Sequence, residues 1–203
     1  GRLEPGQTVS LDGKESCDYP VSYSYAAAQM VTGADQYEKA EIEDPDYLKA
    51  RVMVTLFGGY FGSRLMSNIR EDKGYTYGIS AGIMPYPDSG LLVVNAETAN
   101  EFVEPLIKEV YHEIDRLQND LVPAEELAMV KNYMLGDMCR SYESAFSLAD
   151  AWIFIHTSGL PDSYVRDAVE AVKTITPVEI RELASRYLCK ETLKEIVSGK
   201  KMS

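Results

Sequence analysis

The feature that most constrains the fold of this chain is a glycine-punctuated run over residues 56–78, which reads Leu-Phe-Gly-Gly-Tyr-Phe-Gly-Ser-Arg-Leu-Met-Ser-Asn-Ile-Arg-Glu-Asp-Lys-Gly-Tyr-Thr-Tyr-Gly. Gly58, Gly59 and Gly62 can adopt torsions closed to other residues and let a second backbone approach closely. The run predicts a helix end, a glycine-rich break, a short helix over 64–72, a glycine stop and a strand. It contains neither Gly-Lys-Ser/Thr nor Gly-x-Gly-x-x-Gly, so a nucleotide site is not favoured.

Strand-like and helix-like patterns surround this run in an order typical of the α+β class. Strands are predicted for residues 21–32, 76–84, 91–98 and 193–198, with turn residues at 87–90 that make the middle two an antiparallel hairpin. Helices are predicted for residues 45–57, 64–72, 100–117, 123–135, 145–156, 162–173 and 177–187. We therefore expect a mostly antiparallel sheet with helices packed on one face. Residues 1–19 show no such pattern and predict an irregular segment before a single domain over 20–203.

Two helix starts carry specific capping signals. Asp44-Pro45 places a capping carboxylate before a proline at the first helical position. Thr176 and Glu179 are three residues apart, which is the spacing of a capping box.

The charge of the chain excludes some partners. It has 20 Lys and Arg against 32 Asp and Glu, a formal net charge of −12. Such an acidic balance argues against nucleic-acid backbones and anionic membrane surfaces as partners. No apolar run approaches the roughly 18 residues of a spanning helix, so we expect no membrane span.

The cysteines suggest a compartment. Cys17, Cys139 and Cys189 are odd in number and widely spaced, so they predict no disulfide framework and no zinc ribbon. Idle thiols are typical of a reducing compartment, which favours the cytoplasm. The polar N-terminus has no apolar signal core, but a leading Gly without Met suggests an excised piece from which a signal or an earlier domain has been removed.

The spacing of Arg70 and Tyr77 suggests a binding site. Seven residues and a reversal at Gly74 can bring a guanidinium and a phenol to one edge of the sheet, where both would donate hydrogen bonds to a peptide carbonyl or an oxyanion. The simpler interpretation is that Arg70 stabilises a helix end and Tyr77 packs in the core. Tyr75 should lie on the same strand face as Tyr77, so spacing does not choose between them.

The run over residues 56–78 resembles the signature of the C-terminal, non-catalytic domain of insulinase/pitrilysin-like zinc metallopeptidases. Weaker similarities at residues 44–47, 122–127 and 174–180 extend the resemblance over roughly residues 20–200. It implies one half of a clamshell, in which homologous α+β domains face one another around a closed chamber. One domain of such an enzyme carries zinc on an inverted His-x-x-Glu-His motif, with a distal Glu as third ligand.

In that family the other domain supplies an Arg and a Tyr that contact the substrate backbone near the scissile bond. The resemblance implies that these are Arg70 and Tyr77 here, and that Gly58, Gly59 and Gly62 form a loop near the substrate or the partner domain.

The histidines argue against a zinc site in this chain. Only His112 and His156 are present, and neither belongs to His-x-x-Glu-His or His-Glu-x-x-His. Glu113 follows His112, but Arg116 stands where a second histidine would be needed. We therefore expect helix-surface or packing roles for both, no metal bound by this chain and no hydrolysis by the chain alone.

These observations predict an accessory, substrate-orienting domain of a zinc-dependent endopeptidase. The zinc would come from a homologous domain of the same precursor or of a partner chain, the substrate would be a peptide, and a dimer is possible. The first alternative is a catalytically inactive family member that acts as a scaffold or assembly subunit. A domain that binds a small molecule independently is the second alternative.

Overall fold

The computed structural model describes residues 8–11, 23–30, 46–86 and 89–198. A five-stranded sheet has the order β1-β5-β2-β4-β3. Its strands are β1 (Thr8–Leu11), β2 (Tyr23–Met30), β3 (Thr76–Tyr86), β4 (Ser89–Ala99) and β5 (Leu193–Ser198). Among the described strands, the β1–β5 pair is parallel and the β2–β4, β2–β5 and β3–β4 pairs are antiparallel.

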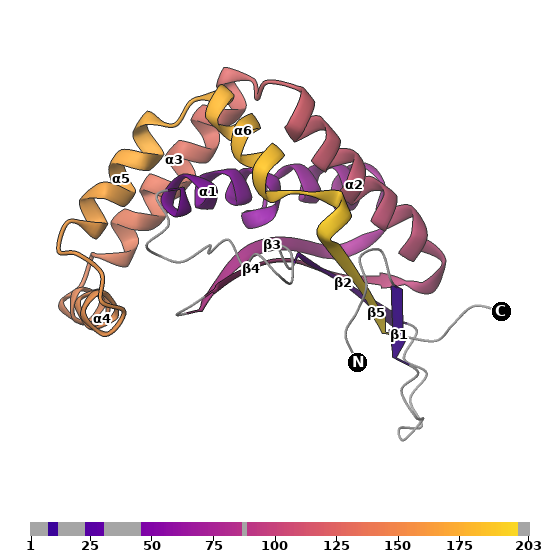
Figure 1. Cartoon of the computed structure of the whole chain (residues 1–203), viewed down its shortest axis with the longest axis horizontal. Helices are drawn as coiled ribbons and strands as arrows, with labels where there is room; N and C mark the ends of the chain where they lie inside the picture. The colour runs from indigo at the N-terminus through magenta and orange to yellow at the C-terminus, as the bar shows by residue number, and fades with distance from the viewer. Residues whose placement is uncertain (1–7, 12–22, 31–45, 87–88, 199–203) are drawn as a thin grey trace.

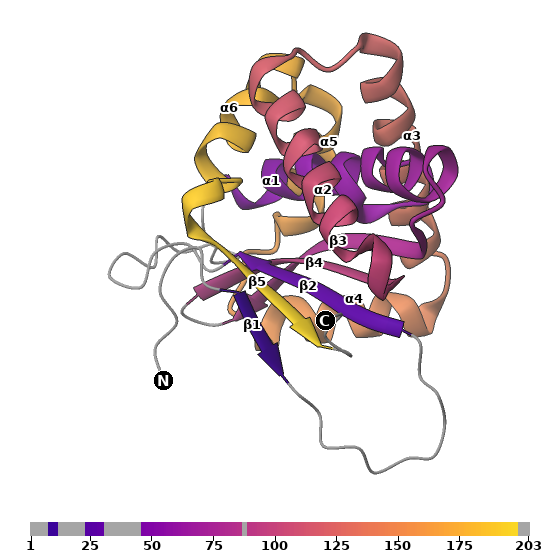
Figure 2. The same ribbon diagram turned by 90° about the vertical axis from the view of Figure 1, so that its right-hand side faces the viewer.

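The described residues also form six α-helices. They are α1 (Tyr47–Val54), α2 (Val103–Asn119), α3 (Ala124–Ser141), α4 (Ala145–Thr157), α5 (Tyr164–Thr174) and α6 (Pro177–Tyr187). Figure 1 shows α1, α2 and α6 over one face of the sheet, with α3 and α5 beside them and α4 at the lower edge of that group. The same layering is visible from the side in Figure 2. The predicted α+β class, with helices on one face of a mostly antiparallel sheet, is confirmed.

The core lies between the sheet and the helices. Its largest fully buried side chains come from the segment around α1, from α2 and from the segment that includes α6: Phe57, Met53, Leu56, Leu65, Ile69, Leu106, Ile114, Leu117, Ile175, Ile180 and Leu188. Burial of these apolar surfaces is the main source of stability. The glycine-punctuated run therefore contributes directly to the core.

The segment between α1 and β3 differs in detail from the prediction. Thr55–Gly59 and Met66–Asp72 are π-helical, and the first ends at the predicted glycines. π-Helical turns are uncommon and are frequent at functional sites. α2 also begins later than predicted, at Val103, after a 3-10 turn over Asn100–Phe102.

One prediction about the N-terminal segment is wrong. Residues 1–19 are expected to be irregular, yet Thr8–Leu11 forms β1 and pairs in parallel with β5. Four residues are too few to show a periodic pattern, and this strand depends on the edge that β5 offers.

The Asp44-Pro45 cap, the tip of the 87–90 turn and Cys17 lie outside the described residues, whereas Cys139 and Cys189 are free thiols. Within the described ranges, no helix is long and apolar enough to cross a membrane.

The capping box of α6 is confirmed and allows a stability prediction. Thr176 Oγ1 accepts a hydrogen bond from the Glu179 backbone N–H at 3.3 Å, and Glu179 Oε2 accepts one from the Thr176 N–H at 2.8 Å. We expect Thr176→Ala to lower the free energy of unfolding by about 1 kcal/mol. Urea unfolding would measure this loss, and Thr174→Ala, which removes a hydroxyl outside the box, is the matched control. Equal loss in both variants would show that the box contributes nothing.

Candidate functional site

Arg70 and Tyr77 are joined by a tight reversal. Arg70 lies in the π-helical segment Met66–Asp72, and the chain turns at Gly74, whose φ is +65°. The Gly74 N–H donates to the Arg70 carbonyl at 3.1 Å, and the Tyr75 N–H donates to the Ile69 carbonyl at 3.0 Å. A left-handed residue of this kind is most easily a glycine. The reversal leads directly into β3, which is an edge strand of the sheet.

A β-bulge at the start of β3 determines where Tyr77 points. Thr76 pairs with Thr98 and Gly78 with the next residue, Glu97, so Tyr77 has no partner in β4. Thr76 Oγ1 stabilises the irregularity because it donates to the Glu97 carbonyl at 2.5 Å and accepts from the Gly78 N–H at 3.0 Å. Bulges of this kind re-aim side chains.

The bulge separates the two tyrosines that spacing could not distinguish. Ile79 and Ala81 are buried against the helices, and strict alternation would place Tyr77 with them. Instead, Tyr77 is 91% exposed. Tyr75 is half-buried and stacks on Phe102 with ring centroids 5.2 Å apart. The expectation that Tyr75 and Tyr77 share one face is therefore wrong.

The Arg70 guanidinium lies against Tyr77, as the spacing predicts. Its Nε donates to the Tyr77 carbonyl at 2.8 Å, and its Nη1 pairs with Glu71. Its Cζ lies 4.8 Å from the centroid of the Phe61 ring and 5.7 Å from that of the Tyr77 ring, so the cation contacts two aromatic rings. Sequence reasoning missed Phe61. The only available signal was an aromatic residue inside the glycine-rich break.

This arrangement offers hydrogen-bond donors at an exposed edge. Among the described residues, neither Arg70 Nη2 nor the Tyr77 hydroxyl has a hydrogen-bond partner. Guanidinium and phenol groups donate strongly to carbonyl and carboxylate oxygens. The pair can therefore hold an extended backbone or an anionic oxygen at the edge of the sheet.

The three predicted loop glycines do not share one role. In the described ranges only Gly74 and Gly159 have positive φ, so special torsions are not the reason for Gly58, Gly59 or Gly62. A Cβ at Gly58 would lie 2.6 Å from the Ala81 Cβ, which is too close for any side chain. Gly58 therefore allows the helical segment to approach β3.

The other two glycines have more room. A Cβ at Gly59 would meet Thr55 at 3.3 Å, and one at Gly62 would meet the movable Tyr60 ring at 2.9 Å. Both residues are exposed, unlike Gly58.

A polar cleft of about 420 Å³ lies between the 62–73 segment, α2 and the start of α3. Arg64 makes two hydrogen bonds with Glu126, at 2.7 and 2.9 Å. The fully buried Glu113 accepts from Asn68 Nδ2 at 2.7 Å and from Arg116 at 3.0 Å. These charges largely neutralise one another, which identifies the cleft lining as a stabilising ion-pair network.

Burial and hydrogen bonding act in opposite directions on the groups of this cleft. Burial raises the pKa of Glu109. Hydrogen bonds from Lys73 and Asn68 together lower it by more than burial raises it, so the pKa of Glu109 lies below its usual value. Burial lowers the pKa of Arg64, but its pairing with Glu126 leaves the pKa above the usual value. Both groups therefore remain charged at neutral pH.

The histidines lie on helix surfaces. His112 is exposed on α2 at the rim of the polar cleft, and His156 is exposed on α4 with its ring 4.0 Å from that of Trp152. In the described part of the chain, no group of three His, Cys, Asp or Glu side chains could hold a metal ion.

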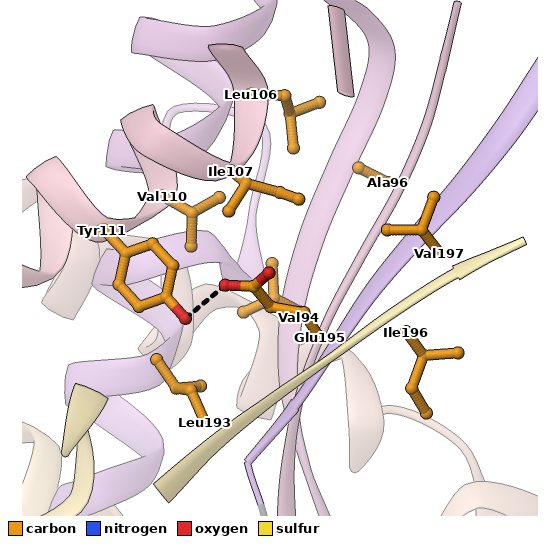
Figure 3. A pocket seen from close by; sticks show the side chains of 10 residues that line it. All are labelled: Val94, Ala96, Leu106, Ile107, Val110, Tyr111, Leu193, Glu195, Ile196 and Val197. Atoms are coloured by element: carbon orange, nitrogen blue, oxygen red, sulfur yellow. Dashed lines mark hydrogen bonds between the residues drawn. The ribbon is translucent and has the colours of Figure 1, made fainter. Parts of the chain in front are cut away.

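An apolar pocket between α2 and the sheet is too small for a ligand. Its volume is about 20 Å³, which is room for one water molecule. Figure 3 shows Tyr111 and Glu195 pointing toward one another inside it, with the hydroxyl donating to Glu195 Oε1 at 2.7 Å. Burial, followed by the neighbouring carboxylate, raises the pKa of Tyr111 far above its usual value. This pocket belongs to the core.

Comparison with known proteins gives a consistent result. The model of the family described as "Peptidase M16 inactive domain" matches residues 27–134. An uncharacterized zinc protease of Bacillus subtilis is 31% identical over 96 residues, which are 47% of this chain and 24% of that protein. Another from Rickettsia felis is 30% identical over 95 residues, 47% of this chain and 23% of that protein. The matched stretch thus spans about a quarter of each relative's length.

Solved structures share the fold. The peptidase M16 inactive domain from Pseudomonas fluorescens superposes with a TM-score of 0.80 at 22% identity, covering 97% of this chain and 43% of that one. A protease from Helicobacter pylori also gives 0.80, at 16% identity, covering 96% of this chain and 43% of that one.

Proposed function

This chain belongs to the peptidase M16 inactive-domain family, and from that premise we propose that it is the substrate-orienting half of a zinc-dependent endopeptidase. The observation that carries the proposal is the pairing of Arg70 with an outward-facing Tyr77 at the edge of the sheet. The polypeptide substrate and the partner that completes the enzyme are part of the same proposal.

The role of the two side chains follows from their chemistry. A peptide lying along the edge presents carbonyl oxygens, and Arg70 Nη2 and the Tyr77 hydroxyl can donate to one of them. The Phe61 ring limits the freedom of the guanidinium, so less side-chain entropy is lost on binding. Donors held in place in this way also stabilise the negative charge that develops on a carbonyl under attack.

Zinc would be held by the partner domain. The curated relatives are named zinc proteases. The described residues of this chain offer no suitable ligand cluster, so they do not fit a zinc site. A zinc ion in such an enzyme supplies an activated water and polarises the carbonyl. This chain would position the peptide and donate hydrogen bonds to its backbone.

The test is peptide cleavage by the chain assembled with its zinc-bearing partner domain. We expect Tyr77→Phe to lower kcat by about tenfold or more, because it removes one hydroxyl donor. Its unfolding midpoint should not change, since the ring is exposed. Tyr75→Phe is the matched control and should retain activity, because stacking on Phe102 needs only the ring.

Other outcomes would have definite meanings. Loss of activity only in Tyr75→Phe would move the functional tyrosine to position 75. Full activity in both variants would favour the alternative role of a scaffold or assembly subunit.

A further inference from the structure

A second cleft lies at the opposite end of β3 from Tyr77. It has a volume of about 340 Å³ and is lined by side chains of α1, β3, α4 and α5 together with Tyr142. Figure 1 shows α4 and α5 at the left-hand end of the molecule, with α1 extending from there over the sheet. Ile83, which lines the cleft, is six residues beyond Tyr77, or roughly 20 Å along a strand. The cleft is therefore separate from the Arg70 site.

The cleft contains an arginine that has no carboxylate partner among the residues the structure describes. Arg51 lines it, and among the described residues no carboxylate lies within 4.0 Å of its guanidinium. The arginines of the polar cleft differ, because Arg64 pairs with Glu126 and Arg116 with Glu113. A guanidinium without such a partner favours an anionic ligand.

Three phenols share the cleft with this guanidinium. Tyr47, Tyr142 and Tyr164 line it, and Arg51 is near enough to Tyr47 and Tyr164 for its charge to act on both phenols. Burial raises the pKa of both Tyr47 and Tyr164. Their hydroxyls therefore stay protonated at neutral pH and can donate to an anion.

The remaining wall is apolar. Ile83 comes from β3, and Phe154 and Ile155 come from α4. A volume of about 340 Å³ lies at the lower end of the range of small-ligand sites. A bare inorganic anion would leave this wall without contacts.

We propose that the cleft binds a carboxylate carried on an apolar or aromatic body. The carboxylate accepts from the Arg51 guanidinium and from the tyrosine hydroxyls, and the apolar body lies against Ile83, Phe154 and Ile155. Two sources have this chemistry: the C-terminus of a peptide with an apolar last residue, and a free organic acid.

The chain contains its own reporter for this binding. Trp152 is the only tryptophan, and it lies on α4 next to Ala151, which lines the cleft. We would titrate the full chain with 3-phenylpropionate and follow Trp152 fluorescence. A saturable change is expected with the acid and none with the neutral 3-phenylpropanamide, because only the acid has the charge that Arg51 recognises.

Variants locate the site. Arg51→Gln should weaken binding of 3-phenylpropionate by at least about tenfold, and Tyr142→Phe and Tyr164→Phe should each weaken it by about threefold to tenfold. Arg140→Gln is the matched control, since Arg140 is an exposed arginine on α3 paired with Asp137, and its affinity should not change. The two Tyr→Phe variants keep the ring and decide the question if Arg51→Gln does not fold.

Short peptides that end in phenylalanine, with a free or an amidated C-terminus, distinguish a peptide ligand from a free organic acid when their binding is measured in the same way. Tighter binding of the free peptide than of 3-phenylpropionate identifies a peptide C-terminus, and the reverse order identifies an organic acid. Three outcomes would each overturn the proposal. They are equal binding of the acid and the amide, unchanged affinity for 3-phenylpropionate in the Arg51 and tyrosine variants, and competition by inorganic phosphate as strong as that by the acid.

Discussion

Arg70→Ala should lower kcat/KM for peptide cleavage by at least about a hundredfold in the chain assembled with its zinc-bearing partner domain. The loss of one preorganised donor to a developing oxyanion typically costs this much, or about 2.7 kcal/mol. The guanidinium also donates to the Tyr77 carbonyl and contacts the Tyr77 ring, so its removal should loosen the second donor as well. Initial rates over a range of substrate concentrations would separate kcat from KM.

Two controls make this result specific. Arg166→Ala removes an exposed arginine of α5 that pairs with Asp167 and should leave turnover unchanged. Glu71→Gln removes the carboxylate that pairs with Arg70 and should leave turnover unchanged or raise it, because another donor of the guanidinium becomes available. If Arg70→Ala cleaves peptides as fast as the unsubstituted protein, the substrate-orienting role is wrong.

Gly58→Ala should lower the free energy of unfolding by about 2–3 kcal/mol, a large effect for one methyl group. The new Cβ would lie 2.6 Å from the Ala81 Cβ and 2.7 Å from the Ala81 backbone nitrogen. Neither neighbour is a flexible side chain, so either the helical segment or β3 must move. Urea denaturation followed by circular dichroism would give this difference.

Gly82→Ala is the matched control, on the strand β3 that Gly58 approaches. Nothing lies within 4 Å of a Cβ at Gly82, and its φ is not positive. We expect a change of less than about 0.5 kcal/mol there, or a slight gain from lower entropy of the unfolded chain. If both variants lose a similar free energy of unfolding, the close approach of residue 58 to β3 is not the reason for a glycine at that position.

Local patterns predicted most elements, because each depends on signals a few residues apart. The antiparallel hairpin follows from alternation around turn residues, and α6 follows from Thr176 and Glu179. The π-helical geometry after α1 and the late start of α2 were missed, since both depend on how these segments pack on the sheet.

The elements that sequence reasoning missed depend on distant parts of the chain. β1 forms because β5, almost two hundred residues later, offers an edge. The cleft around Arg51 was not predicted because its lining comes from helices far apart in sequence and from β3. Arg51 is half-buried, unlike a surface arginine, and this burial arises only when those elements assemble.

By itself, the sequence determined the α+β order of elements, the short connection between Arg70 and Tyr77 and the lack of a His-x-x-Glu-His motif. Only the tertiary structure decided which tyrosine is presented. Strict alternation would bury Tyr77 with Ile79 and Ala81, but the β-bulge inserts one residue opposite β4 and turns the Tyr77 ring outward beside Arg70. A bulge arises from the pairing of two strands, so a single strand's sequence cannot specify it.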